Sequence, residues 1–436
     1  MAPSKDFASL YDELEWRGIL YQVTDPSLKD RMKSPMTFYV GFDPTSDSLH
    51  LGSLLPVVTM KRFQQAGHRP LFLVGGATGL IGDPSGKTQE RVLLTPETVQ
   101  TNINGIRKVA ERFLDFSGPH ATKIVNNIDW IGGMGAIAFL RDVGKHFTVN
   151  MMLGKDSVKG RLESRDHGIS YTEFSYMILQ SYDFYHLQKT ENCHLQMGGS
   201  DQWGNITAGI DLIRRMNAAE GEEVAHAHVF GLTWPLVTKS DGTKFGKSEA
   251  GNVWLDGVRT TAYQFYQYLL QTPDSDVIRF LKLFSFKSKA EIEALEKQVQ
   301  TDPAARAAQK ELARELTELV HGKAEVQGVE AASGALFGGG DLSGMSLSAL
   351  KTAFAEAPAT KKERLSGEVP LIDLLVETGL CSSKGAARKD LEGGGIYLNQ
   401  VRVEDVKKVI QTTDLLHGQM VVLRKGKKNY HLVFFG

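Results

Sequence analysis

Between residues 36 and 236, short apolar runs alternate with stretches of helical spacing, and no other feature constrains the fold as much. Residues 36–42 and 69–76 have the continuous apolar character of buried strands, and residues 52–67 between them have helical spacing and end in glycine. Helical spacing recurs at 96–115, 136–152 and 171–189, and strand candidates recur at 123–127, 194–200 and 229–237. The alternation predicts an α/β fold with a mostly parallel sheet.

The composition changes after residue 250, where Ala, Glu, Lys and Leu at helical spacing dominate to about residue 331. A stretch rich in Gly and Ser at 333–344 predicts a linker, and short helical and strand-like segments follow it. We therefore expect an α/β domain at 1–248, a helical domain at 249–332, a linker at 333–366 and a small α+β domain at 367–436.

The charge and the distribution of apolar residues argue against several classes of protein. A net charge of −1 gives no overall field that would hold the chain on nucleic acid or an anionic membrane, so RNA contacts would need local basic patches. No apolar run approaches the roughly 20 residues of a membrane span, and the first residues are too acidic for a transit peptide. We expect a cytoplasmic protein that makes no use of a membrane.

The two cysteines, Cys193 and Cys381, lie far apart and have no neighbouring Cys or His at the spacing of metal ligands. We therefore expect neither a disulfide framework nor a zinc site, and no other metal held by the protein alone.

The glycine-rich segment 73–91 raises the possibility of a P-loop nucleotidase. The motif G-x-x-x-x-G-K-[ST] ending at Thr88 would need glycine at position 81, which is Ile81, so the match fails. What remains is a glycine loop with one carboxylate, Asp83, followed by two cations, Lys87 and Arg91. A purely structural glycine loop is the alternative.

Residues 39–53 leave a predicted strand and enter a predicted helix. A helix start exposes unpaired N–H groups and favours phosphate, so His50 is a candidate donor to phosphate oxygens. Gly52 would leave room for a nucleotide to approach the backbone. A turn with a solvated or capping histidine is the competing interpretation.

Tyr176, Gln180 and Asp183 fall at i, i+4 and i+7 of a predicted helix, so a hydroxyl, an amide and a carboxylate share one face. Such a trio can recognise a small polar ligand. A solvated polar face is the alternative, but the apolar residues 177–179 between them favour a partly buried helix.

Two further segments carry candidate groups. Asp201 follows a predicted strand, where a carboxylate can accept hydrogen bonds from ribose hydroxyls, although helix capping by Ser200 or Asp201 explains it equally well. Lys244 and Lys247 lie in a glycine-containing loop that could close over developing negative charge, although solvated lysines are the simpler alternative.

Together these segments resemble the class I aminoacyl-tRNA synthetases. HLGS at 50–53 is similar to the HIGH signature, KFGKS at 244–248 is similar to KMSKS, and the other segments resemble the tyrosyl members of the bacterial type in particular. The resemblance covers essentially the whole chain. It implies a Rossmann-like catalytic domain, a helical tRNA-contacting domain and a small RNA-binding domain shared with a ribosomal protein.

The same resemblance implies activation of L-tyrosine with ATP, release of pyrophosphate, and transfer of tyrosine to the 3′ end of tRNA(Tyr). Mg²⁺ is expected to enter with ATP, and a homodimer is implied. The implied tyrosine-binding residues are Tyr39, Asp83, Tyr176, Gln180, Asp183 and Gln202. The implied ATP-binding residues are Gly41, Asp43, His50, Gly52, Ser53, Gly199, Asp201, Lys247 and Ser248. The implied catalytic residues are Thr45, His50, Lys87, Arg91, Lys244 and Lys247.

One position departs from the signature, because Ser53 stands where HIGH ends in His. A hydroxyl can still donate to an oxygen of the nucleotide, but its reach is shorter.

The tail from Cys381 onward is basic, with 10 Lys or Arg against 5 Asp or Glu. Basic side chains on a compact surface predict phosphate contacts that weaken with salt, with simple solubility as the alternative. The candidate tRNA-binding residues are Lys384, Arg388, Lys389, Arg424, Lys425, Lys427 and Lys428.

Two other functions remain to be weighed. Tryptophan activation fits poorly, because indole has no phenol hydroxyl for Tyr39 and Asp183 to bind. A catalytically altered, synthetase-like RNA-binding paralogue could have lost His50 or the loop lysines, and both are retained.

Overall fold

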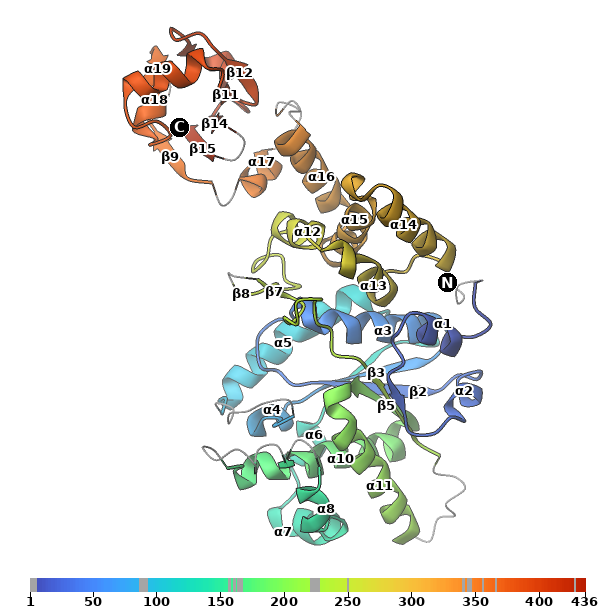
Figure 1. The fold of residues 1–436 in the computed structure, drawn as a ribbon. Helices are drawn as coiled ribbons and strands as arrows, with labels where there is room; N and C mark the ends of the chain where they lie inside the picture. The colour runs from blue at the N-terminus through green and yellow to red at the C-terminus, as the bar shows by residue number, and fades with distance from the viewer. Residues whose placement is uncertain are drawn as a thin grey trace. The chain divides into compact units, whose positions relative to one another are not determined.

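The computed structural model describes residues 6–85, 93–155, 158–159, 162, 168–219, 228–248, 251–338, 342, 347–354, 357–364, 367–426 and 429–436. Its contacts divide the chain into two units, one formed by residues 1–260 with 268–316 and the other by 261–267 with 317–436 (Figure 1). No helix among the described residues has both the length and the apolar character needed to cross a membrane.

A six-stranded sheet forms the centre of the first unit, with the order β1-β6-β5-β2-β3-β4. All neighbouring strands are parallel except the edge pair β1 and β6. Its strands are β1 (Gln22–Val23), β2 (Thr37–Phe42), β3 (Arg69–Val74), β4 (Lys123–Asn126), β5 (Cys193–Gly199) and β6 (Phe230–Trp234). The expected α/β fold with a mostly parallel sheet is confirmed.

The helices cover both faces of this sheet, with α3 and α5 on one side and α10 and α11 on the other (Figure 1). The helices are α1 (Leu10–Trp16), α2 (Leu28–Arg31), η1 (Leu51–Ser53), α3 (Leu54–Gln65), α4 (Thr78–Ile81), α5 (Pro96–Phe113), α6 (Ile128–Ile131), α7 (Ala136–Ala138), η2 (Phe139–Val143), η3 (Gly144–His146), α8 (Val149–Leu153), α10 (Tyr171–Glu191), η4 (Ser200–Gln202), α11 (Trp203–Ala219), α13 (Asp274–Phe284), α14 (Lys289–Thr301) and η6 (Pro303–Ala305). Two more helices, α12 (Ala262–Leu270) and α15 (Ala307–His321), have residues in both units.

Helix α10 carries the predicted trio of polar residues and has well-defined ends. Ser170 accepts a hydrogen bond from the Glu173 N–H at its start, and Asn192 ends it in the left-handed region with φ of 51°. Buried residues lie all around this helix, because it packs against both the sheet and α11. Tyr176 and Asp183 are among the buried residues of this helix.

The second unit contains a five-stranded sheet with the order β12-β11-β14-β15-β9. Helices α18 (Leu371–Glu377) and α19 (Lys384–Glu392) pack on one face through a core that includes Leu374, Leu391 and Leu423. The other elements are α16 (Lys323–Gly338), α17 (Leu347–Ala353), β9 (Ala359–Lys362), β10 (Val369–Pro370), β11 (Ile396–Leu398), β12 (Val401–Val403), β13 (Val409–Ile410), η7 (Thr412–Asp414), β14 (Met420–Lys425) and β15 (Asn429–Phe435). Both α17 and β9 lie within residues 333–366, for which the sequence predicts a linker.

Candidate active site

Asp183 lies inside the first unit on α10 and is only 2% exposed. Trp130 Nε1 donates to one carboxylate oxygen at 2.8 Å, and Asn127 Nδ2 donates to the other at 3.0 Å. Burial raises the pKa of Asp183 to about 8, even though these two hydrogen bonds act to lower it, and Asp43 raises it further.

Tyr39 on β2 is 1% exposed, and its ring lies 5.5 Å from that of Phe184. Burial and the nearby Asp183 raise the pKa of its hydroxyl well above the ordinary value. The hydroxyl oxygen is buried and has no hydrogen-bond partner in the described parts of the chain. Buried polar groups are almost always paired, so the hydroxyl of Tyr39 is an exception that calls for an explanation.

A chain of hydrogen bonds connects Asp183 to the end of β2. Asn127 Nδ2 also donates to Thr78 Oγ1 at 3.0 Å, and Thr78 Oγ1 donates to Asp43 at 2.7 Å. The Tyr176 hydroxyl donates to the other oxygen of Asp43 at 2.8 Å. Tyr176 and Asp183, predicted to share a helix face, thus belong to one polar network.

A second network surrounds Asp83, which follows α4. Gln202 Nε2 donates to its carboxylate at 2.7 Å, and the Ser85 N–H donates at 2.9 Å. Asn205 Nδ2 donates to both Gln202 at 3.1 Å and Gln180 at 3.0 Å. Carboxylate and amide groups from three distant segments therefore meet beside α10.

His50 begins the short helix η1 that leads into α3. Its Nδ1 accepts a hydrogen bond from the Gly52 N–H at 3.0 Å, so the neutral ring carries its proton on Nε2. A Cβ atom at Gly52 would lie 2.8 Å from the imidazole, so any other residue here would displace the His50 ring. Ser53 makes no side-chain capping bond to α3. Gly41 and Thr45 are exposed in the same region.

The KFGKS segment packs directly against the HLGS segment. The Leu51 N–H donates to the carbonyl of Val253 at 2.7 Å, and Gly246 has φ of 86°. A Cβ atom at Gly246 would lie 2.9 Å from the backbone nitrogen of Gly52. The two segments, far apart in the sequence, are therefore neighbours. Lys244, Lys247 and Ser248 are exposed beside them, in or next to the hairpin of β7 (Lys247–Ser248) and β8 (Gly251–Asn252).

Gly199 and Asp201 lie at the carboxyl end of β5. A Cβ atom at Gly199 would lie 2.5 Å from the Asp201 carboxylate, which therefore folds back over the glycine. Lys87 and Arg91 lie outside the described residues.

Known protein families and relatives match nearly the whole length of this chain. The family model for class I tRNA synthetases (W and Y) matches residues 31–338, and that for the tyrosine–tRNA ligase SYY-like C-terminal domain matches 349–433. The chain is 52% identical to the tyrosine–tRNA ligase of Geobacillus stearothermophilus, over 97% of this chain and 99% of the relative. The chain belongs to the tyrosyl-tRNA synthetases of the bacterial type.

Other synthetases agree with this assignment. The tyrosine–tRNA ligase of Streptomyces griseus is 53% identical over 98% of this chain and 99% of its own length. The C-terminally truncated mitochondrial tyrosyl-tRNA synthetase of Aspergillus nidulans has a similar fold, with a TM-score of 0.69 and 31% identity. That similarity covers 76% of this chain and 95% of the solved one.

The sequence analysis missed four residues of the synthetase's polar networks, namely Thr78, Asn127, Trp130 and Asn205. Asn127 was detectable, because it is the last residue of the strand predicted at 123–127, and ligand groups gather at the carboxyl ends of parallel strands. Trp130 and Asn205 carried no comparable signal.

In the second unit of the synthetase, the basic residues differ in their surroundings. Lys384 pairs with Asp373 at 2.6 Å, and Lys425 pairs with Asp390 at 2.7 Å. Arg388 and Lys389 are exposed on α19. The remaining two, Lys427 and Lys428, lie outside the described residues.

Arg424 differs from these because its guanidinium lies over the ring of Tyr397, 3.6 Å from the ring centre. Register places Arg402, Tyr397, Arg424 and Tyr430 side by side across four strands. Cations and aromatic rings thus alternate on one face of the sheet.

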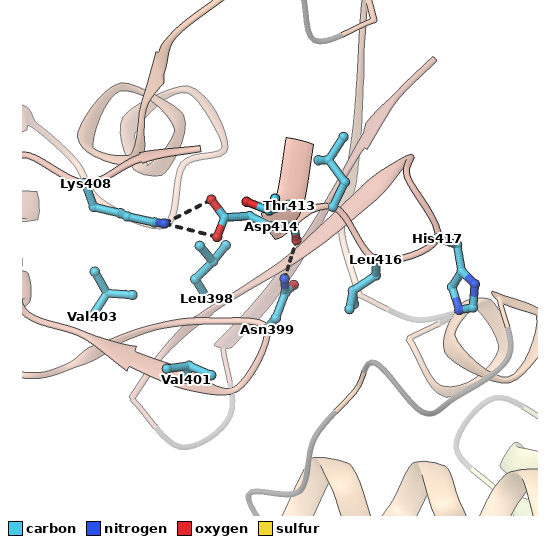
Figure 2. Close-up of a pocket in the computed structure, with 10 residues that line it drawn as sticks. Leu398, Asn399, Val401, Val403, Lys408, Thr413, Asp414, Leu416 and His417 are labelled. Atoms are coloured by element: carbon cyan, nitrogen blue, oxygen red, sulfur yellow. Dashed lines mark hydrogen bonds and ion pairs between the residues drawn. The ribbon is translucent and has the colours of Figure 1, made fainter. Parts of the chain in front are cut away.

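The second unit of the synthetase also has a pocket of ≈ 450 Å³ between the β11–β12 hairpin and residues 413–417 (Figure 2). Lys408 lines it and is held by Asp414 at 3.0 Å, so these two charges compensate each other (Figure 2). The Asn399 amide donates to the backbone of Asp414 and fixes the hairpin against this segment. We assign no ligand to this pocket.

Proposed function

We propose that this tyrosine–tRNA ligase binds the phenol hydroxyl of its substrate between Tyr39 and Asp183. The observation that carries the proposal is the buried, unpartnered hydroxyl of Tyr39 close to a buried carboxyl group. Tyrosine supplies the missing hydrogen-bonding group, whereas phenylalanine leaves the buried Tyr39 hydroxyl without a partner, at a cost of roughly 1–3 kcal/mol.

Groups from both polar networks bind the other end of the amino acid. Asp83, Tyr176 and Gln180 take the α-amino group, since a carboxylate and neutral oxygen atoms suit an ammonium ion. Gln202, which already donates to Asp83, lies beside the substrate carboxylate.

ATP binds across the junction of the two signature segments, with Mg²⁺ as part of the substrate complex. His50 Nε2–H and Thr45 donate to phosphate oxygens, while Gly52 and Gly41 allow the nucleotide to lie close to the backbone. Asp43, Ser53 and Ser248 complete the ATP site, and Gly199 and Asp201 contact the ribose. Lys87, Arg91, Lys244 and Lys247 hold the pyrophosphate.

Activation requires little covalent work from the protein. The tyrosine carboxylate attacks the α-phosphorus of ATP, a phosphorus–oxygen bond forms, and the bond to pyrophosphate breaks. The enzyme contributes alignment of the two substrates and stabilisation of charge that grows on the phosphate oxygens. A terminal ribose hydroxyl of tRNA then attacks the tyrosyl-adenylate and releases AMP.

The second unit binds tRNA(Tyr) through its basic side chains. Exposed Arg388 and Lys389 suit phosphate, and Lys384, Lys425, Lys427 and Lys428 add positive charge to the same unit. Arg424 differs, because a guanidinium supported by the Tyr397 ring presents a flat cationic face to RNA.

A homodimer is supported by the apolar surface of residues 128–153. Ile128, Ile137, Leu140, Val149 and Leu153 are large apolar side chains that are exposed within this one segment. A concentration of exposed apolar groups marks an interaction site. The enzyme works in the cytoplasm, where tRNA is charged for protein synthesis.

Exchange of labelled pyrophosphate into ATP tests the activation step. We expect exchange that depends on tyrosine and not on tryptophan. Lys247→Ala should slow it about 100-fold, because one donor to developing charge is lost. Exchange driven equally well by tryptophan, or unaffected by Lys247→Ala, would contradict the proposal.

A further inference from the structure

The N-terminal side of the loop that carries Lys244 and Lys247 is attached to helix α13. Asp276 in the first turn of α13 is 1% exposed. Its carboxylate accepts a hydrogen bond from the Ser240 N–H at 2.9 Å and from the Ser240 hydroxyl at 3.0 Å. Arg279 pairs with the other oxygen of Asp276 at 3.0 Å and also donates to the carbonyl of Thr238.

Asp276 is held in its charged form by these partners. Burial acts to raise its pKa, but the hydrogen bonds from Ser240 and Arg279 outweigh burial and lower the pKa. A buried, ionised carboxylate with a full set of donors is rigid, because each donor would be costly to leave unpaired.

The middle of the loop, at Phe245 and Gly246, is attached to α13 and α12. Phe245, between the two lysines, is buried, and its ring lies 4.4 Å from Phe280 and 5.1 Å from Phe284. The Gly246 N–H donates to the hydroxyl of Tyr268 at 2.9 Å. The loop is therefore fixed at Ser240 and at Phe245 and Gly246, while the side chains of Lys244 and Lys247 stay exposed.

We propose that Asp276 is a positioning residue for activation: it fixes the base of the loop, so that Lys244 and Lys247 meet the phosphates of ATP in the reactive geometry. Asp276 touches neither substrate and acts through Ser240. The inference rests on the proposed role of the two lysines. Since a misplacement of about 1 Å can reduce a rate about 100-fold, loss of this anchor should affect catalysis more than folding.

Asp276→Asn tests the proposal, because it keeps the size of the side chain and removes the charge that Ser240 and Arg279 bind. Asp274→Asn is the matched control, on the same first turn of α13 but bonded to Gln309 rather than to the loop. We expect Asp276→Asn to lower kcat for pyrophosphate exchange about 10- to 100-fold with KM for tyrosine unchanged. Asp274→Asn should leave kcat unchanged, whatever its effect on Tm.

Limited trypsin digestion of the full chain provides a second readout that does not depend on activity. Cleavage after Lys244 or Lys247, followed by mass spectrometry of the fragments, should be faster in Asp276→Asn than in the parent and the control. Unchanged kcat and cleavage in Asp276→Asn would overturn the inference. Losses of activity in proportion to the decrease in Tm in both variants would also overturn the inference.

Lys247→Ala separates this inference from the function on which it rests. If Lys247→Ala slows exchange while Asp276→Asn does not, only the positioning role is refuted. If Lys247→Ala has no effect, the proposed role of the loop lysines fails and the inference fails with it.

Discussion

The Asp183 carboxyl group accepts hydrogen bonds from two neutral donors, Asn127 and Trp130. Among the described residues no cation acts on this carboxyl group, so burial dominates and the pKa is raised to about 8. Under the proposed function, recognition of a phenol hydroxyl by Asp183 comes at the expense of stability, as is common for binding sites.

The free energy of unfolding of the unliganded enzyme should therefore change with pH because of Asp183. Its pKa is about 8 in the folded protein and near 3.8 when unfolded, so the folded state binds the extra proton between these values. Stability is then lost as pH rises through this window, by up to about 1.4 kcal/mol per pH unit. Asp183→Asn should remove this slope. Thermal unfolding of the parent and of Asp183→Asn between pH 5 and 8 measures this slope. The same pH dependence of stability in both proteins would contradict the raised pKa of Asp183.

At the scale of a residue, spacing alone placed Tyr176, Gln180 and Asp183 on one helix face. The structure brings all three into neighbouring polar networks. Spacing could not reveal Trp130 or Asn205, because each reaches the site only after α6 or α11 has packed beside α10. Such contacts depend on tertiary packing and leave no periodic trace in the sequence.

At the scale of an element, the long apolar runs were the most predictable features. Strands expected at 36–42, 69–76 and 123–127 are confirmed as β2, β3 and β4. A helix starting at residue 96 is confirmed as α5, which Thr95 caps and Pro96 begins. In each case burial and local propensity favour the same structure.

Short, irregular and polar elements were harder to predict. The edge strand β1 has two residues, too few to show a period of two. The segment 136–152, expected to be helical throughout, is divided into α7, a π-helical turn, a 3₁₀ turn and α8. Strand β9 is polar and pairs only with β15, so nothing in residues 359–362 predicted it.

At the scale of the whole molecule, the exposed apolar segment 128–153 accounts for the proposed homodimer. Ile137, 78% exposed, is a suitable place to disrupt it. Ile137→Lys should weaken association at least about 10-fold, because a charge would be buried at the interface. Val258→Lys, at a position 93% exposed and outside the segment, is the control and should not change it. Analytical ultracentrifugation over a range of concentrations measures both, and an unchanged dimer in Ile137→Lys would refute the assigned surface.

The central claim is that Tyr39 and Asp183 together bind the substrate hydroxyl. The most direct test compares kcat/KM for tyrosine and for phenylalanine, by pyrophosphate exchange, in the parent and in Tyr39→Phe. Tyr182→Phe, next to Asp183 in α10, serves as the control. We predict that Tyr39→Phe lowers kcat/KM for tyrosine about 10-fold, because tyrosine loses a hydrogen bond, and does not lower that for phenylalanine, because no unpaired hydroxyl is left beside its ring. An equal decrease for both amino acids would contradict the account.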